Sequence, residues 1–309
     1  MRVSLALSAR PSKGRPRAYV LLAAFACISC GARLMKLPTG PGAPVAPAVA
    51  AARLAQATSA CLAVRTLTAE IAVSGSAGAR RLRGRLLAGL SAPTASSTSA
   101  PAASSASAPA ASSTSAFASV RLEAVAPFGP PLFIFVATGN DATLLLPRDN
   151  RVLEHGRPDE VLEATAGVPF AAADLLPILT GCTSVDAPAE VRGFGDRWNV
   201  VATTEGGLYL QREKTTEPWR IVANERRAAD GARWRAESSE FQDGLPTSIR
   251  VTSLDEDGGV RQAFDLRLVL SQVEINTPLG APVFTVQIPA SATPITLDEL
   301  RASGPLGSR

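Results

Sequence analysis

The sequence has few of the side chains that carry catalysis or bind metal ions. Its 309 residues include one histidine and four cysteines. One histidine cannot form a two-histidine zinc site, and no Cys/His spacing suits zinc. The sequence also lacks the Gly-x-Ser-x-Gly, Gly-x-Gly-x-x-Gly and Walker motifs of hydrolases and nucleotide-binding proteins. We therefore predict no catalytic residue, no metal and no cofactor, and a protein that is not an enzyme. His155, before Gly156, is expected to be an exposed turn residue.

The chain has almost no excess of one charge sign over the other once the first 29 residues are set aside. The chain has 31 basic and 27 acidic residues, and residues 1–29 hold five of the basic ones and no acidic one. The remainder has 26 basic and 27 acidic residues, a net charge of about −1. We see no lone basic patch in it. Since nucleic acid is held mainly by positive charge, the sequence predicts no nucleic-acid partner.

Long apolar runs are also missing, and the longest candidate lies near the N-terminus. Ala18–Ser29 is an uncharged run of 12 residues behind a basic head. A transmembrane helix needs about 20 apolar residues, so residues 1–29 are predicted to be a secretory signal peptide. Small residues before a cysteine resemble a bacterial lipobox, with Cys30 as the acylated residue and Cys27 as the alternative. Ordinary cleavage without a lipid is the other alternative.

The rest of the chain is predicted to be mainly β. After a lipid anchor and flexible linker over residues 30–48, a helix is expected from Val49 to Val64. Alternating apolar and polar residues, as in Thr66–Gly75, indicate antiparallel strands with one buried face. The expected strands are Thr66–Gly75, Arg81–Leu90, Ala118–Val125, Leu132–Val136, Ala142–Leu146, Arg151–Glu154, Val191–Phe194, Trp198–Thr203, Gly207–Gln211, Trp219–Asn224, Ala232–Ser238, Thr247–Ser253, Val260–Ile275 and Val283–Ile288.

Two features interrupt this pattern. Residues 91–116 contain only Ala, Ser, Thr and Pro, which offers almost no apolar side chain to offset ordering entropy, so we predict a disordered insertion. Helices are expected over Arg157–Thr165 and Ala171–Thr180, with Gly181 as a C-cap, and over Leu297–Ala302. Leu132–Val136 is apolar on both faces and needs cover on each. Residues 49–300 fit one large β domain, with a C-terminal tail at 301–309.

Two cysteines remain beyond the anchor region. Cys61 lies at the end of the first helix and Cys182 follows the helix that ends at Thr180. In an exported protein we predict that they form a disulfide between these helices. Two free buried thiols are the alternative.

Several segments resemble a known family. Arg121–Gly129, Asp141–Asp149, Val161–Pro169 and the residues Ala173–Leu176 with Thr180–Gly181 are similar to LolB-type outer-membrane lipoprotein receptors, within the wider Lol carrier and receptor fold. The order of elements is similar from Val49 to Leu300. The insertion and the tail from Ile295 depart from the family pattern.

This resemblance implies a half-open antiparallel β-barrel covered by a helical lid. Its apolar cavity would accept the acyl chains of lipoproteins or lipids. An exposed tip, here Pro127, Phe128 and Gly129, would help deliver cargo into the membrane, although Phe128 could instead be a buried hairpin residue. The residues expected in the cavity or its lid are Leu132, Phe133, Ile134, Phe135, Val161, Leu162, Leu175, Leu176 and Leu179. A densely packed core without a cavity would give the same sequence pattern.

The leading hypothesis is a monomeric, lipid-anchored protein of the outer membrane that faces the periplasm. It would bind acyl chains and receive lipoproteins from a periplasmic lipoprotein carrier. Gly31, in place of Asp after Cys30, favours the outer membrane. The second hypothesis is a signalling or structural envelope lipoprotein of the same fold that binds a protein partner. A secreted hydrolase has the least support.

Overall fold

The computed structural model describes residues 34–93, 118–183, 190–204, 206–227, 231–255, 260–303 and 307–308. The chain forms two units, Met1–Met35 and Lys36–Arg309, and the fold described below is that of the second. The expected signal peptide, Cys27, Cys30 and most of the 91–116 insertion lie outside the described residues.

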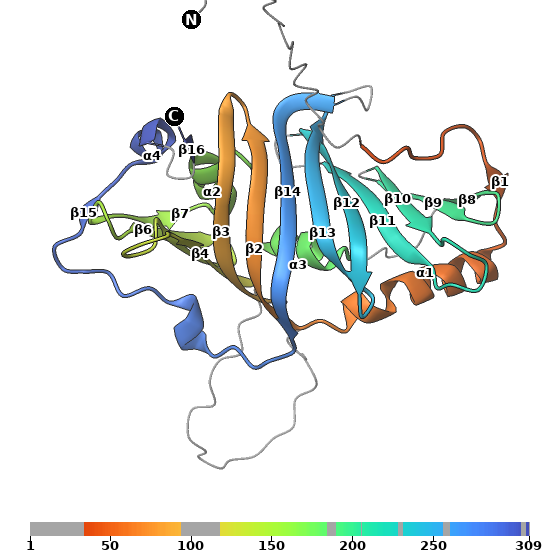
Figure 1. The fold of residues 1–309 in the computed structure, drawn as a ribbon, viewed down its shortest axis with the longest axis horizontal. Coiled ribbons are helices and arrows are strands. Elements are labelled where there is room, and N and C mark those ends of the chain that lie inside the picture. The colour runs from red at the N-terminus through yellow and green to blue at the C-terminus, as the bar shows by residue number, and fades with distance from the viewer. Residues whose placement is uncertain are drawn as a thin grey trace, which may run out of the picture. The chain divides into compact units, whose positions relative to one another are not determined.

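Most of this unit is one large antiparallel sheet (Figure 1). Its order is β1-β8-β9-β10-β11-β12-β13-β14-β2-β3-β4-β5-β6-β7-β15, and β16 also pairs with β3. The strands are β1 (Ala43–Pro44), β2 (Thr66–Ala77), β3 (Arg80–Ser91), β4 (Ser119–Val125), β5 (Ile134–Thr138), β6 (Asp141–Leu146), β7 (Arg151–Gly156), β8 (Glu190–Phe194), β9 (Trp198–Ala202), β10 (Gly207–Gln211), β11 (Arg220–Arg227), β12 (Arg233–Gln242), β13 (Leu245–Leu254), β14 (Val260–Ile275), β15 (Thr293–Pro294) and β16 (Gly307–Ser308).

The sheet is open and does not close into a barrel. In the described residues its two edges are β1 and β15, which do not pair with each other. Each edge strand is two residues long and contains a proline, Pro44 or Pro294. Because proline cannot donate to a further strand, both edges are poor templates for adding another chain. The mainly β fold is confirmed, with an open sheet in place of the half-open barrel.

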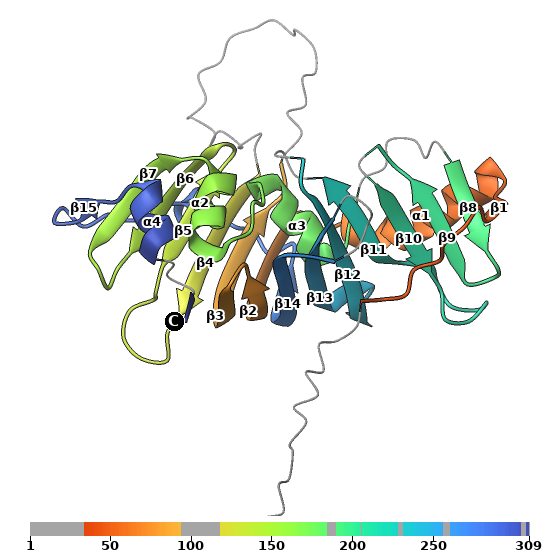
Figure 2. The same cartoon turned by 90° about the horizontal axis from the view of Figure 1, so that it is seen from above.

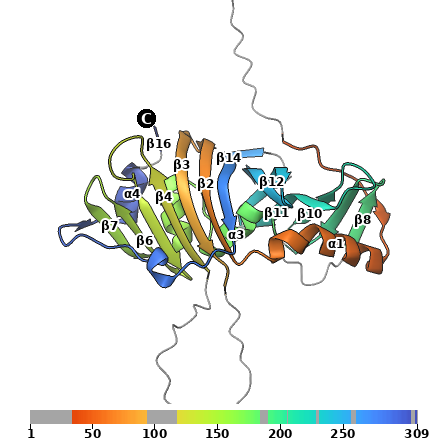
Figure 3. The same cartoon turned by 60° about the horizontal axis from the view of Figure 1, so that its bottom comes forward.

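The described residues form four α-helices: α1 (Pro47–Leu62), α2 (Pro158–Ala166), α3 (Ala172–Thr180) and α4 (Leu297–Ser303). Figure 2 shows α2 and α3 over one face of the central strands, and Figure 3 shows α1 running along β8–β11. Gly181 ends α3 in the left-handed region at φ +66°, as the C-cap prediction requires. At α4, the Thr296 hydroxyl accepts from the Glu299 N–H at 3.3 Å, so Thr296 is the N-cap of this helix.

Buried residues form two apolar cores on the helix-covered face. The first, the lid core, lies between α2, α3 and strands β2–β7 and β12–β14, and the second, the α1 core, lies between α1 and β8–β11. Strand register places the buried residues of neighbouring strands side by side, for example Leu122 opposite Phe135 and Leu144 opposite the same residue. The two regions join where β11 pairs with β12, for example with Asn224 opposite Ala236.

Three sequence expectations about the chain ends are wrong. The expected linker over 30–48 includes Ala43–Pro44, which pairs with Gly193 and Arg192 of β8. The expected tail at 301–309 contributes Gly307–Ser308, which pairs with Leu82 and Arg81 of β3. The expected strand Val283–Ile288 does not form, and a 3-10 helix at Ala281–Phe284 begins this region instead.

The segment around Ala281–Phe284 covers the second face of β5. Val136 of β5 is buried on that face, in register with Arg121 of β4. The Arg121 guanidinium donates to the carbonyl oxygens of Val283 and Thr285, at 3.2 and 3.1 Å. The expectation that the doubly apolar strand needs cover on both faces is therefore confirmed, and the mispredicted strand supplies that cover.

Candidate functional site: an apolar cavity under the helices

An apolar cavity of about 90 Å³ lies between the helices α2 and α3 and the sheet. Strands β2, β3, β4, β13 and β14 form its floor, and the two helices with the loop between them form its roof. Its lining residues are Ile71, Val73, Leu82, Leu86, Leu122, Phe133, Leu162, Thr165, Ala166, Val168, Phe170, Leu175, Ile178, Leu179, Val251, Leu266 and Leu268.

The cavity has an apolar wall without any titratable side chain among its described lining residues. The one polar lining residue is Thr165, and its hydroxyl donates to the Val161 carbonyl oxygen at 2.6 Å within α2. A satisfied hydroxyl does not need a polar ligand. Such a wall can exclude water and favours methylene groups, at roughly 0.8 kcal/mol for each one buried.

The strands build this wall because their side chains alternate between faces. Val73 and Ile71 of β2 are in register with Leu268 and Leu270 of β14, so apolar residues from both strands reach the same face. Gly75 lies between them at φ +141°. A Cβ atom there would lie 2.0 Å from the Asp265 carbonyl oxygen, so only glycine fits this close approach of β2 and β14.

The structure separates the nine expected cavity residues into two groups. Four of them line the cavity: Phe133, Leu162, Leu175 and Leu179. The other five do not line it. Leu132 and Leu176 pack at the margin of the core, and Phe135 and Val161 are fully buried within it. Ile134 points to the opposite face of β5.

The sequence analysis missed most of the floor of the cavity. Val73, Leu82 and Leu122 all belong to the alternating apolar positions of their strands, so the signal was present. The expected site was instead placed on the strand that is apolar on both faces and on the two helices α2 and α3. Phe170, between α2 and α3, carried no such signal. It packs against Trp234 and Phe264 with ring centroids 5.3 and 5.7 Å apart.

The expected membrane tip is exposed. Phe128, between β4 and β5, has 89% of its surface accessible, so it is not a buried hairpin residue. The Arg148 guanidinium donates to the Phe128 carbonyl oxygen at 2.6 Å and to that of Pro130 at 3.2 Å. Gly129 adopts φ +78° beside Pro127. The loop is therefore held by its backbone while the aromatic ring projects into solvent.

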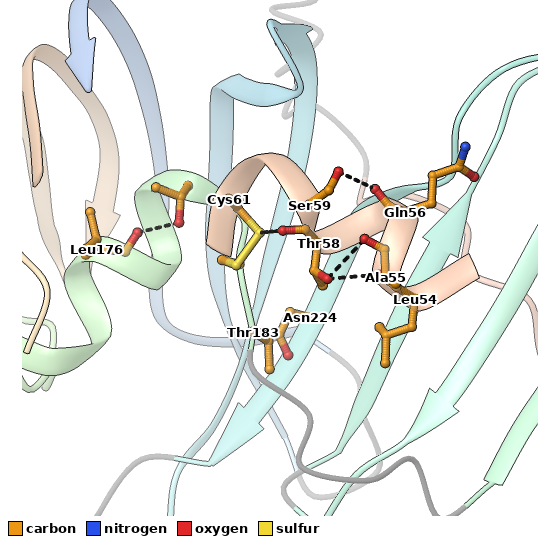
Figure 4. Close-up of a disulfide and its surroundings, with 11 residues drawn as sticks. Leu54, Ala55, Gln56, Thr58, Ser59, Cys61, Leu176, Thr183 and Asn224 are labelled. Atoms are coloured by element: carbon orange, nitrogen blue, oxygen red, sulfur yellow. Dashed lines mark hydrogen bonds between the residues drawn. A yellow bond between two sulfur atoms is a disulfide. The ribbon is translucent and has the colours of Figure 1, made fainter. Parts of the chain in front are cut away.

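A disulfide joins the covers of the two cores, as predicted. Cys61 in the last turn of α1 is bonded to Cys182, with 5.5 Å between their Cα atoms and a sequence separation of 121 (Figure 4). Next to it, the Thr58 hydroxyl donates to the Leu54 carbonyl oxygen at 3.0 Å. Asn224 of β11 donates to the Thr183 hydroxyl just beyond the bond. The chain that follows α3 is thus fixed to α1 and to the sheet.

Charged residues are concentrated on the face of the sheet away from the helices. Arg250 of β13 and Asp265 of β14 form two hydrogen bonds, at 2.8 and 2.7 Å. These bonds lower the pKa of the Asp265 carboxyl. Arg235 binds Glu225 with two further bonds at 3.1 and 2.6 Å. These ion pairs are structural and lie across the sheet from the cavity.

Other expected or possible sites are accounted for as follows. His155 is exposed, with its Nδ1 atom 3.3 Å from Asp141 Oδ1, as expected of a turn histidine. In the described ranges, no three His, Cys, Asp or Glu side chains come together as a metal site. No helix within those same ranges has the length and apolar character needed to cross a bilayer. A second hollow of about 410 Å³ lies at the N-terminal ends of α2 and α3, bordered by Asn140, Arg157 and Asp159.

No protein family and no curated protein matches the sequence. Similar solved structures include a LolA superfamily protein from Nitrosomonas europaea, with a TM-score of 0.47, 12% identity, and coverage of 77% of this chain and 97% of that one. A DUF1329 family protein from Desulfovibrio piger has a TM-score of 0.46 and 10% identity over 78% of this chain and 98% of that one. A domain described as that of an outer-membrane lipoprotein-sorting protein, from Vibrio parahaemolyticus, has a TM-score of 0.44 and 13% identity over 77% and 94%.

These TM-scores are below 0.5, so the likenesses identify neither a family nor a ligand for this chain. The fold class follows from the strand order and register of the chain itself. The LolB-type resemblance stays a prediction.

Proposed function

We propose that this chain is a non-enzymatic, lipid-anchored protein of the bacterial outer membrane that binds acyl chains under α2 and α3. The observation that carries the proposal is the apolar cavity, whose single polar lining group is already hydrogen-bonded within its own helix. In this proposal the anchor is on Cys30, or on Cys27. The cargo is a lipoprotein received from a periplasmic lipoprotein carrier.

The position of the cavity supports delivery at the Phe128 end of the sheet. Phe133, in the cavity wall, follows the same loop that carries Phe128. Leu82, also in the wall, lies near the β2–β3 turn. Because Arg85 of β3 is opposite Val125 of β4, this turn is at the same end of the sheet as the loop that follows β4. The apolar wall and the exposed ring therefore occupy the same end of these strands. An acyl chain leaving the cavity there would pass beside Phe128.

The cavity must widen to hold a whole acyl chain. Its volume of about 90 Å³ is well below the roughly 300 Å³ at which small-molecule pockets begin. Both helices of the roof end in left-handed glycines, Gly167 at φ +73° and Gly181 at φ +66°. We propose that the roof moves away from the sheet between these two caps. The disulfide at Cys182 keeps the C-terminal end of α3 in place.

Ala166→Phe tests the cavity directly. The phenyl ring would occupy the space of roughly two or three methylenes, which corresponds to about thirtyfold weaker acyl binding. The measurement is displacement of a fluorescent fatty acid from the purified chain, with lipid mass spectrometry of the wild-type extract. Ala57→Phe is the matched control because Ala57 is partly buried against the α1 core.

We expect acyl binding to weaken in Ala166→Phe and to be unchanged in Ala57→Phe, with both variants folded. Equal binding by the wild type and Ala166→Phe would place the ligand elsewhere. Absence of any co-purifying or exchangeable acyl ligand would reject the carrier role. The small cavity volume would then favour the second function, an envelope lipoprotein of this fold that binds a protein partner.

Phe128→Glu tests delivery. Because the Phe128 side chain is exposed, the variant should unfold at the wild-type temperature and keep its acyl binding. Transfer of a bound lipoprotein to vesicles should fall, because a carboxylate disfavours the membrane interface. Phe128→Leu keeps the apolar side chain and should retain transfer. A large loss of thermal stability in Phe128→Glu would instead assign Phe128 to the core.

A further inference from the structure

Three turns meet at the end of the sheet where Phe128 projects. Pairing of Arg85 with Val125 brings the β2–β3 turn and the loop after β4 to the same end of the sheet, where Gly307–Ser308 of β16 also pairs with Leu82 and Arg81 of β3. Pairing of Ile134 with Leu145 brings the β6–β7 turn to the same end. Arg148 in that turn contacts the Phe128 loop directly. Segments from residues 77–85, 125–133 and 146–151 thus form one surface.

Four arginines, which we call the tip arginines, lie on this surface: Arg80, Arg81, Arg83 and Arg148. All four are exposed. Arg148 binds only the carbonyl oxygens of Phe128 and Pro130. Arg80 donates to the carbonyl oxygen of Arg301 in α4. In the described part of the chain, no carboxylate lies within 4.0 Å of any tip arginine.

Three acidic residues near this surface are already paired with other arginines, and a fourth, Asp149 of the β6–β7 turn, is exposed. On β2, Glu70 binds Arg85 at 2.9 Å. In and beside α4, Glu299 binds Arg151 at 3.0 Å and Asp298 binds Arg301 at 3.0 Å. The three paired acids neutralise their own partners, and Asp149 offsets one charge, so the four tip arginines leave an excess of about three positive charges. The sequence analysis saw no basic patch, although three of these arginines are close together in the chain, and strand register adds Arg148 to them.

An anionic phospholipid surface matches this combination of groups. Guanidinium groups bind phosphate oxygens with paired hydrogen bonds. Apolar and aromatic side chains beside basic ones are typical of segments that lie at the membrane interface. Phe128 is 89% exposed at the same end of the sheet as these arginines, whereas an acidic protein partner would give no reason for an aromatic ring to remain in water. The surface thus combines electrostatic binding of phosphates with an apolar side chain that can enter the membrane interface.

We infer that the tip arginines and Phe128 form a docking surface for phosphate headgroups of acidic phospholipids. This extends the membrane role proposed for Phe128 and does not depend on what occupies the cavity. Phe128 enters the interface while the arginines bind the surrounding phosphates. Each arginine near an anionic surface strengthens binding about fivefold, so two contribute about twentyfold.

Vesicle partition of the full chain tests this surface. Cys27→Ser with Cys30→Ser in every sample removes acylation as a cause of binding. The test variant adds Arg81→Gln and Arg83→Gln, whose side chains contact no partner that the structure describes. The matched control adds Arg65→Gln and Arg197→Gln, two exposed arginines outside this surface with the same change of charge. Partition is measured on phosphatidylcholine vesicles with and without phosphatidylglycerol.

We expect the parent chain and the control to prefer phosphatidylglycerol vesicles, and high salt to weaken that preference. The test variant should lose about twentyfold on those vesicles, and its fatty-acid displacement should equal that of the parent. Equal partition to both kinds of vesicle, or no loss in the test variant, would overturn the docking surface. Loss of carrier binding with vesicle binding unchanged would assign the arginines to an acidic protein partner instead. Fatty-acid displacement is measured independently of vesicle partition, so a negative vesicle result would not contradict the proposal that the cavity binds acyl chains.

Discussion

The two cores of the sheet are covered by helices in different ways. Under α1, the Trp219 ring lies between two guanidinium groups, with Arg53 at 5.0 Å and Arg212 at 4.8 Å from its centroid. Arg53 also donates to the Asn199 side-chain oxygen at 3.0 Å. Under α2 and α3, aliphatic side chains with Phe133 and Phe170 surround a cavity. The α1 core is therefore fixed by polar and aromatic contacts, whereas the lid core depends mainly on apolar packing, with one ion pair at 3.2 Å between Arg226 of β11 and Asp174 of α3.

This difference shows how one sheet can support both a fixed cover and a cover able to move. Hydrogen bonds and cation–π contacts are directional, so they hold α1 at one position on β8–β11. The α1 core even contains a buried Asn199 side-chain nitrogen without a hydrogen-bond partner in the described residues. Apolar packing is not directional. Helices α2 and α3 can consequently move on the sheet at a lower cost, with the disulfide as the fixed point between the two cores.

Removing the disulfide should have the largest effect on this comparison. Cys61→Ser with Cys182→Ser frees a loop of about 121 residues, and the expected loss of stability is about 5 kcal/mol. Urea unfolding of the variant against the oxidised wild type measures it. Hydrogen exchange should rise mainly in α3, because α1 keeps its polar contacts. An equal rise in α1 would show that the two covers are not independently held.

Truncation of one leucine in each core should have a smaller effect. Leu208→Ala in the α1 core, where Leu208 is fully buried, should cost about 4 kcal/mol. Leu179→Ala in the lid core should cost about 2 kcal/mol, because Leu179 borders the cavity and loses fewer packing contacts. Denaturant unfolding of both variants gives the two values. If Leu179→Ala costs as much as Leu208→Ala, the lid core is packed as densely as the α1 core.

The ion pair between β13 and β14, on the face of the sheet away from the lid core, should contribute least. Arg250 lowers the pKa of Asp265, so the pair stabilises the fold above the unfolded-state pKa of about 3.9. That contribution is lost as the pH falls through the lower folded-state pKa. Because the Asp265 side chain is 39% exposed, solvent screening limits it to below about 1 kcal/mol.

Thermal unfolding of Asp265→Asn and of the wild type, measured from about pH 3 to about pH 7, tests the direction of this change in stability. This interval of roughly four pH units includes the pKa of a carboxyl group. The wild type should be the more stable above about pH 5, and the difference should shrink below about pH 4. A difference that grows towards low pH would contradict the assigned pKa direction. Ser271→Ala on the same face of β14 is a control without a titrating group.

Local patterns predicted most elements because each depends on neighbours in the sequence. The strand Val260–Ile275 was predicted with the observed bounds, and α3 differs from its prediction by one residue. Val283–Ile288 was mispredicted because its apolar residues cover a neighbouring strand and do not pair in the sheet. The linker was mispredicted because the pairing of Ala43–Pro44 depends on β8, which lies about 150 residues away in the chain.

The sequence by itself determined the mainly β fold, the order of helices and strands, and which face of each strand is apolar. It also indicated the disulfide, since the two cysteines lie at the ends of their helices. Only the tertiary structure decided that a cavity exists, because volume depends on how closely α2 and α3 approach the sheet. It also decided that Arg148 joins three arginines from a distant hairpin, because strand register, and not sequence distance, sets which turns meet.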